Sequence, residues 1–223
     1  MNLVGIDTST DMISIAMMIK DRLVLNFNRY RKHGASGVMS CLEGGLKKLS
    51  INLDIFDAFV VGAGPGSFTG LRISFSIIKA LSLALKKPVI KIESFSASAH
   101  QFKNRFAKIA TIADAKRNLI YGVTFRIRGS RLKKEKKESL YTLKDFVEKN
   151  KDYFFVTYNR FLRDELKKID SSIRFSKRDV WPKAKNLLII AKDYFQYKKF
   201  TPLDRLEPLY VYPKDCQVRK IES

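Results

Sequence analysis

Cysteine and histidine are scarce in this chain of 223 residues, which contains two of each. The cysteines, Cys41 and Cys216, are too few for a disulfide framework and show no metal-ligand spacing. His33 and His100 have no ligand-type residue three or four positions away, which argues against a zinc or paired-histidine iron site. A G-x-S-x-G elbow is also missing, which argues against a hydrolytic triad. The sequence therefore offers no convincing catalytic set and no metal site.

Long apolar runs and targeting segments are missing as well. The apolar stretch 12–19 is far shorter than a membrane span, and no basic region with a cleavage site surrounds it. Hydrophobic residues make up 45% of the chain and aromatic residues 12%, which is typical of a globular protein. We therefore expect a cytoplasmic protein without membrane contact.

Acidic residues are outnumbered by basic ones, 22 against 43, so the net charge is +21. Residues 1–100 contain 12 Lys and Arg against 7 Asp and Glu, whereas residues 101–223 contain 31 against 15. A polyanion should therefore bind the second half. The interleaved lysines and glutamates at 133–138 are equally typical of a solvated, lysine-rich surface, so both interpretations stay open.

Apolar runs and turn signals divide the chain near residues 94–101. The first part predicts strands at 3–7, 12–19, 23–30, 58–61 and 89–92, with helices at 35–49 and 71–85. The second part predicts strands at 107–113, 119–128, 132–141 and 153–157, helices at 142–150, 161–169 and 183–197, and an extended tail at 206–213. Both orders predict an α/β fold with mixed sheets flanked by helices. We expect domains at 1–100 and 101–223, the second strongly basic and a degenerate repeat of the first.

The segment 62–70 contains four glycines and a proline between a predicted strand and a predicted helix. Backbone N–H groups at such a point could face an anion. The segment is not a Walker A loop, because Leu71 and Arg72 stand where Lys and Ser or Thr are needed, and its spacing is not G-x-G-x-x-G. It is either a weak anion loop or a rigid turn in which Ser67 or Thr69 caps the helix, and we favour the turn.

Asp7 ends the first predicted strand, as an aspartate does in actin-like ATPases. Those sites usually place a glycine directly after the aspartate so that phosphate can approach the backbone, and here Thr8 would crowd it. Nucleotide affinity should therefore be weak or absent. An actin-like ATPase or phosphotransferase remains the alternative function, and its vestigial loop residues would be Asp7, Thr8, Gly64, Gly66, Ser67, Thr69 and Gly70.

Two helices of the first half predict a subunit interface. Helix 35–49 is dense in small residues, and its interior glycines cost about 1 kcal/mol each against alanine, which favours close approach of another backbone. Helix 71–85 is apolar nearly all round, which is typical of a helix buried on both sides. We predict a dimer through this pair, with contacts from Gly37, Cys41, Gly44, Gly45, Leu71, Phe75, Ile78, Leu81 and Leu85.

Several blocks of the chain match a known family at compatible spacings. They are LVGIDTS at 3–9, GAGPGSFTGLRI at 62–73, KAL at 79–81, and the looser DAKR at 114–117, IY at 120–121 and PLY at 208–210. Over its whole length the chain resembles the TsaB family, also called YeaZ, and GPGSFTGLR is the most specific block. The resemblance implies a two-lobed, actin-like or Hsp70-type (ASKHA) fold.

The same resemblance implies a role in making N6-threonylcarbamoyladenosine (t6A) at position 37 of tRNAs that read codons beginning with adenine. Family members are non-catalytic paralogues of TsaD, the subunit that holds the metal and transfers the threonylcarbamoyl group. They bind TsaD through the first-lobe helices, many self-associate through the same helices, and the ATPase TsaE joins the assembly. We therefore expect a scaffolding subunit with no cofactor of its own. Residues that could help to hold tRNA are Arg126, Arg128, Arg131, Lys133 and Lys134.

Two positions depart from the family pattern. The family often has His-Ser-Glu at the start of the first helix, where this chain has His33-Gly34-Ala35. Glycine and small residues often follow the Arg-Ile pair, where this chain has Ser74 and Phe75. These changes leave the fold expectation intact, and Phe75 would alter how closely a partner helix packs.

Overall fold

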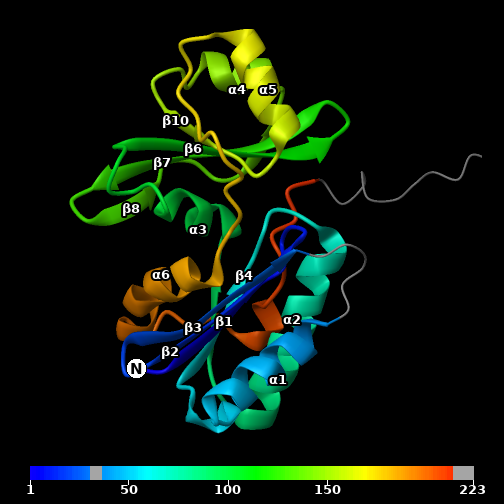
Figure 1. Cartoon of the computed structure of the whole chain (residues 1–223), viewed down its shortest axis with the longest axis vertical. Coiled ribbons are helices and arrows are strands. Elements are labelled where there is room, and N and C mark those ends of the chain that lie inside the picture. Colours follow the sequence, from blue (N-terminus) through cyan, green and yellow to red (C-terminus); the bar gives the residue numbers. More distant parts are fainter. Residues whose placement is uncertain (31–36, 213–223) are drawn as a thin grey trace, which may run out of the picture.

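The computed structural model describes residues 1–30 and 37–212, which form two lobes, each built around a mixed β-sheet (Figure 1). The departures at His33, Gly34 and Ala35, and also Cys216, lie outside the described residues. The two lobes confirm the predicted α/β architecture with mixed sheets and flanking helices.

The first lobe contains a five-stranded sheet in the order β3-β2-β1-β4-β5. Its strands are β1 (Leu3–Asp7), β2 (Met12–Ile19), β3 (Arg22–Tyr30), β4 (Ala58–Gly62) and β5 (Val89–Ile92). The first three are antiparallel to one another in sequence order, and β4 and β5 continue the sheet in parallel with β1. Strands β1 and β4 are buried along their whole length because helices cover both faces of the sheet.

Helices α1 (Val38–Leu49) and α2 (Phe68–Leu85) lie side by side on one face of this sheet (Figure 1). Helix α2 begins three residues before the predicted start because Ser67 is its N-cap, whose side chain accepts a hydrogen bond from the Gly70 amide. By length and composition alone α2 is apolar enough to cross a membrane. A core helix passes the same test, and α2 buries Leu71, Phe75 and Ile78 against the sheet.

The second lobe contains a sheet in the order β10-β6-β7-β8, with β9 also paired to β7. Its strands are β6 (Lys108–Lys116), β7 (Leu119–Arg128), β8 (Arg131–Lys134), β9 (Ser139–Tyr141) and β10 (Phe154–Val156). The strand predicted at 132–141 is wrong as one element, because the charged stretch 135–138 separates β8 from β9. Helices α4 (Leu143–Glu148) and α5 (Arg160–Ile169) cover one face, and Thr142 caps α4 by accepting a hydrogen bond from the Asp145 amide.

The second lobe repeats the topology of the first. Strands β6, β7 and β8 form an antiparallel meander like β1, β2 and β3, and β10 runs parallel to β6 as β4 does to β1. A parallel bridge between Phe155 and Phe175 takes the place of β5. The degenerate repeat expected from the sequence is therefore present in the topology, and its helices α4 and α5 correspond to α1 and α2.

The last helix of each repeat crosses to the other lobe. Helix α3 (Ser94–His100) packs against β6 and β8, whereas α6 (Ala184–Gln196) packs against β1, β2 and β4 (Figure 1). Gly5 allows the approach of α6, because a Cβ there would lie 2.8 Å from Leu188 Cδ2. The sequence pattern did not predict α3, since its serine-rich residues are weak helix formers that are held by burial. A division at residue 100 therefore separates the two sheets, but α3 and α6 each pack on the sheet of the other lobe.

Two short 3-10 turns are also present, η1 (Leu53–Ile55) before β4 and η2 (Leu203–Arg205) after α6. The tail that follows η2 is extended, as predicted. The Leu209 amide donates to Ala63 O at 2.9 Å in the first lobe. The Tyr212 hydroxyl donates to Ala115 O at 2.7 Å in the second. Residues 206–212 therefore connect the lobes at the start of α2.

Candidate functional site

The Asp7 turn and the glycine-rich segment meet in one buried junction, formed by residues 7–10, residues 62–70 and Ser94 (the loop junction). Asp7 is 1% exposed. Its Oδ1 accepts hydrogen bonds from the Ser9 amide at 2.9 Å and the Ser9 hydroxyl at 2.7 Å. Its Oδ2 accepts one from the Ser94 hydroxyl at 2.6 Å. The carboxylate is therefore engaged by groups of its own chain.

Three further hydrogen bonds close the loop junction. Ser94 Oγ accepts from the Gly64 amide at 2.9 Å. Thr8 Oγ1 donates to Gly70 O at 2.6 Å, and the Ser67 amide donates to Ser9 O at 2.6 Å. The Thr8 side chain, which the sequence suggested would crowd a phosphate, thus links the Asp7 turn to the first turn of helix α2.

Two glycines are required where the segments touch. A Cβ on Gly62 would lie 1.9 Å from Asp7 Oδ2, and one on Gly66 would lie 1.9 Å from Ser9 O. Real Cβ atoms essentially never approach so closely, so any side chain there would force the segments apart. The glycine content is thus explained by contact of the chain with itself. This geometry favours the rigid-turn interpretation, with Ser67 rather than the exposed Thr69 as the cap.

Burial corrects the predicted set of interface residues. Five of them point into the first-lobe core and cannot reach a partner: Cys41, Gly45, Leu71, Phe75 and Ile78. The physical reason is that α1 and α2 each turn this row toward the sheet. The other side of α2 is exposed in the single chain, so its burial against a partner stays a prediction. The departure at Phe75 therefore changes core packing and not a partner contact.

The remaining members of that set differ in exposure. Gly37 is half-buried at the N-cap of α1 with φ of 95°, a conformation that glycine adopts without strain. Leu81 and Leu85 are half-buried at the edge of the core. Gly44 is exposed, and a Cβ there would have nothing within 4 Å, in contrast to Gly45, whose Cβ would lie 2.6 Å from Leu25 Cδ2. Nothing inside the described chain explains why position 44 is glycine.

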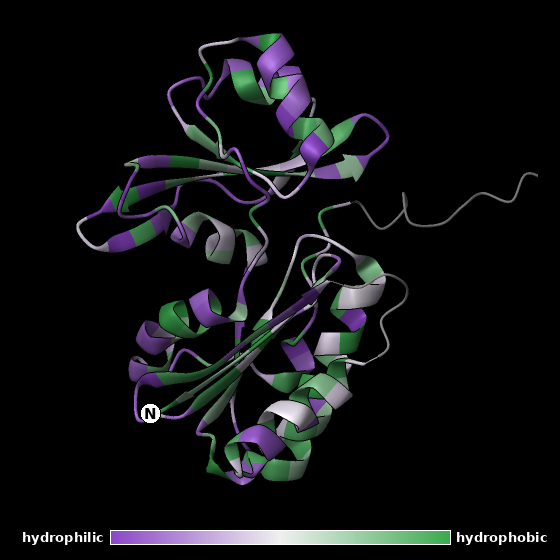
Figure 2. Ribbon diagram, viewed as in Figure 1, coloured by the Kyte–Doolittle hydropathy of each residue, from purple (hydrophilic) through white to green (hydrophobic). Residues whose placement is uncertain are grey.

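Gly44 belongs to an exposed surface of small and apolar residues. This surface, called here the α1–α2 outer surface, comprises Met39, Ser40, Gly44, Phe68, Ser76, Ala80, Leu83 and Ala84. Leu83 is 68% exposed, the highest fraction among the exposed large hydrophobic side chains of the described residues. In Figure 2 the α2 ribbon is nearly all green and white. A surface of this composition suits close packing against other helices.

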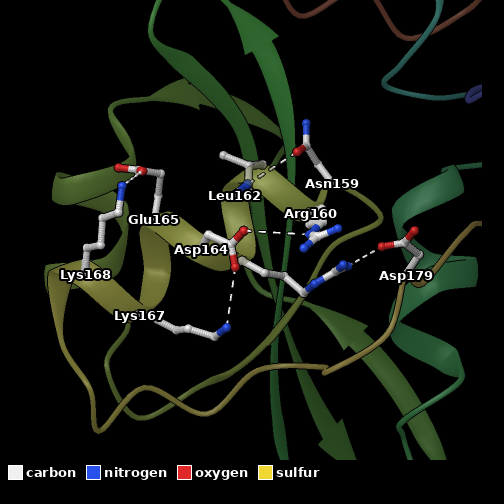
Figure 3. Close-up of polar contacts among 9 residues, drawn as sticks. Asn159, Arg160, Leu162, Asp164, Glu165, Lys167, Lys168 and Asp179 are labelled. Atoms are coloured by element: carbon white, nitrogen blue, oxygen red, sulfur yellow. Dashed lines mark hydrogen bonds and ion pairs between the residues drawn. The ribbon is translucent and has the colours of Figure 1, made fainter.

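The basic residues of α5 are largely neutralised by neighbours (Figure 3). Lys168 pairs with Glu165 at 2.7 Å, Lys167 with Asp164 at 3.4 Å, and Arg163 with Asp179. Asn159 caps the helix by accepting from the Leu162 amide. On this face the lysine-rich sequence forms a solvated surface of local ion pairs, which is the plainer of the two interpretations.

The predicted tRNA-contact residues do not form one free cluster. Arg126 pairs with Glu135 at 2.7 Å, Arg131 with Asp193 at 3.4 Å, and Lys134 with Glu93 at 2.6 Å. The other two, Arg128 and Lys133, are exposed and make no ion pair within residues 1–30 and 37–212. Sequence reasoning missed Lys103, which lies in the turn after α3 and lines a cavity together with Arg131, Lys133 and Lys134.

A second cavity of about 390 Å³ opens beside the loop junction. The start of α2 forms one wall, the turn at Lys116 and Arg117 a second, and the tail at Tyr210 and Tyr212 a third. In the sequence, the feature that could have indicated this cavity is the pair of tyrosines in the apolar, proline-containing tail. Among the described residues, no group of His, Cys, Asp and Glu is arranged to hold a metal ion.

Known proteins share the sequence pattern and the fold of this chain. The family model described as TsaD, tRNA N6-adenosine threonylcarbamoyltransferase, matches residues 29–181. The chain is 31% identical over 128 residues to the tRNA threonylcarbamoyladenosine biosynthesis protein TsaB of Haemophilus influenzae, a match that covers 54% of this chain and about half (52%) of the relative. The TsaB protein of Buchnera aphidicola subsp. Baizongia pistaciae is 24% identical over 94% of this chain and 97% of its own length.

A solved structure shows the same fold. YeaZ from Pseudomonas aeruginosa superposes with a TM-score of 0.82 at 20% identity, over 94% of this chain and 99% of that chain. The family model covers more than half of the sequence, and the relatives and the fold point the same way. The chain belongs to the TsaB (YeaZ) family of tRNA threonylcarbamoyladenosine biosynthesis proteins.

Proposed function

We propose that this chain is a non-catalytic subunit for t6A formation at position 37 of tRNAs reading codons that begin with adenine. It acts by binding and activating a TsaD-type catalytic subunit through the α1–α2 outer surface. The observation that carries the proposal is Gly44, an exposed glycine of α1 with open space above it, together with the exposed Leu83 on the neighbouring α2. An interior helix glycine costs about 1 kcal/mol against alanine, and close approach of a partner helix would offset that cost.

The shape of the surface supports helix-on-helix docking. Ser76, Ala80 and Ala84 follow one another at spacings of four along α2, so they form one row of short side chains. Ser40 and Gly44 form the corresponding row on α1. Two helices of a partner could approach such rows closely, and Leu83 would supply an apolar anchor.

The loop junction supports a scaffolding role over a catalytic one. Asp7 holds serine groups of its own chain, and the glycine-rich segment is packed against the Asp7 turn. The proposal includes a cytoplasmic location, the ATPase TsaE and tRNA as further members of the assembly, and self-association through the α1–α2 outer surface when TsaD is absent.

Co-purification with the catalytic partner tests the docking surface. Gly44→Arg and Leu83→Asp should fold normally, since Gly44 faces open space and Leu83 is 68% exposed, yet each should abolish the complex. Phe161→Asp is the matched control, because Phe161 is 65% exposed on α5 of the other lobe. Retention of the partner by both surface variants at wild-type levels would refute the proposal.

A further inference from the structure

A groove with an excess of positive charge runs between the lobes on the α6 side of the first sheet. Its main cavity has a volume of about 470 Å³ and is walled by the end of α3, strand β8 and helix α6. The charged side chains that line it are Lys103, Arg131, Lys133, Lys134, Glu93 and Asp193. A smaller cavity of about 340 Å³, which shares His100 and Lys103, continues the groove to Lys185. We call both cavities together the interlobe groove.

The cations of the interlobe groove fall into two classes. Lys134 and Arg131 are held by carboxylates of the first lobe and α6, through Glu93 at 2.6 Å and Asp193 at 3.4 Å. Lys103 donates to the Ser130 carbonyl at 3.3 Å. Within the described parts of the chain Lys103, Lys133 and Lys185 make no ion pair. The lining therefore carries more cations than its own carboxylates neutralise.

Two ion pairs join walls of the interlobe groove. Both join β8 of the second lobe to other elements: Lys134 pairs with Glu93, which follows β5 directly, and Arg131 pairs with Asp193 of α6, which packs on the first sheet. The Arg131–Asp193 pair is more than half exposed on both sides, so it contributes little and an incoming anion could replace Asp193. Lys134 is the more enclosed cation, also contacting Glu138 at 3.2 Å, and keeps the walls in place.

We propose that the interlobe groove binds the phosphodiester backbone of a structured RNA, with Lys103 and Lys133 as the principal phosphate contacts. Lysine binds phosphate as a point charge, which suits backbone contacts that carry no sequence information. An acidic protein fits less well, because protein interfaces are centred on apolar and aromatic anchors and charged residues are depleted there. The main cavity offers little of such an apolar anchor. Among the described residues that line it, Ile189 is the one exposed large hydrophobic side chain, at 43% exposure.

This inference rests on the proposed function, which supplies a tRNA as the RNA. The interlobe groove and the α1–α2 outer surface are separate, because α6 lies on the opposite face of the first sheet from α1 and α2 (Figure 1). RNA and a catalytic partner could therefore bind at the same time. The two sites can also be tested independently.

The test measures binding of an unmodified tRNA transcript by fluorescence anisotropy at salt concentrations from about 50 to about 300 mM. Each neutralised phosphate contributes about 0.7 to 0.9 to the slope of log K against log salt, so Lys103→Gln/Lys133→Gln should flatten the slope by about 1.5. Affinity at the lowest salt should fall by about tenfold. The matched control is Lys144→Gln/Lys149→Gln on and beside α4, where both lysines are exposed without ion pairs among the described residues. The control should change this slope by less than about 0.5, which corresponds to less than one phosphate contact.

Co-purification with the catalytic partner separates this inference from the proposed function. The groove variant should keep the partner while losing RNA, and Gly44→Arg should lose the partner while keeping RNA. Equal RNA binding by the groove variant and the α4 control would overturn the inference, as would absence of RNA binding by the wild-type chain at low salt. Loss of the partner from the groove variant with RNA binding intact would assign the groove to a protein contact instead, and would also overturn it.

Discussion

The hydroxyl of Ser94 donates a 2.6 Å hydrogen bond to Oδ2 of Asp7, across 87 positions of sequence. The same Ser94 oxygen accepts from the Gly64 amide, so one side chain connects the end of β1, the glycine-rich segment and the start of α3. Because α3 packs on the second sheet, this contact also ties the first sheet to the other lobe. Asp7 thus serves the assembly of the fold.

Asp7→Ala should lower the free energy of unfolding by about 2–4 kcal/mol, because it leaves buried donors of Ser9 and Ser94 without their acceptor. Asp7→Asn keeps the shape and one oxygen and should cost less. Urea unfolding of the three proteins measures the difference. The structural role would be contradicted by an Asp7→Ala protein as stable as the wild type.

Mg-ATP at millimolar concentration should leave the melting temperature of the chain unchanged, since the loop junction is filled by its own hydrogen bonds. A ligand present at 100 times its dissociation constant would add about 2.7 kcal/mol, which a thermal-shift experiment resolves easily. A clear rise with ATP that Asp7→Asn removes would favour the alternative function, the actin-like ATPase or phosphotransferase.

Local patterns predicted most of the strands and helices because the apolar runs are strong and the turns are marked by glycine, serine and asparagine. They did not predict α3, where Ser94, Ser96 and Ser98 are held in a helix by burial between the lobes. Nor could they assign α6 to the first sheet, since its apolar stripe has no mark of which sheet it covers. Tertiary packing decided both cases.

The candidate surface was predictable only as a pair of helices. Composition alone could not separate Gly44 from Gly45. Gly45 packs against Leu25 and Met17, whereas Gly44 faces open space. Likewise the charge run on β8 did not reveal that Lys133 shares a cavity with Lys103, which is contributed by another part of the chain. Such juxtapositions depend on the register between elements and not on any segment by itself.

The neighbouring glycines of α1 should respond unequally to alanine. Gly44→Ala should raise the free energy of unfolding by about 0.5–1 kcal/mol, because the new methyl group meets no atom and alanine favours the helix. Gly45→Ala should gain less, since its Cβ would lie 2.6 Å from Leu25 Cδ2 and 3.2 Å from Met17 Cε, and both side chains must shift to admit it. Chemical denaturation of both variants provides the measurement. Equal effects in the two proteins would mean that the orientation of α1 is wrong.

His100 should make the chain less stable in mild acid. Burial, followed by the charge of Lys103, lowers the pKa of His100 from 6.5 to about 4, although a hydrogen bond with Asn186 acts in the other direction. Below pH 6.5 the unfolded chain takes up a proton that the folded chain accepts only near pH 4. The stabilising contribution is therefore complete above pH 6.5 and is lost progressively as the pH falls toward 4.

Between pH 7 and 5.5 this loss should amount to about 1 kcal/mol for a half-buried imidazole. His100→Gln should be less sensitive to pH over that interval by the same amount, because glutamine takes up no proton. Urea unfolding of both proteins at pH 7 and 5.5 cancels the contributions of the carboxylates, which the two chains share. Parallel losses in the wild type and in His100→Gln would show that the imidazole is already as accessible to protons in the folded chain as in the unfolded one.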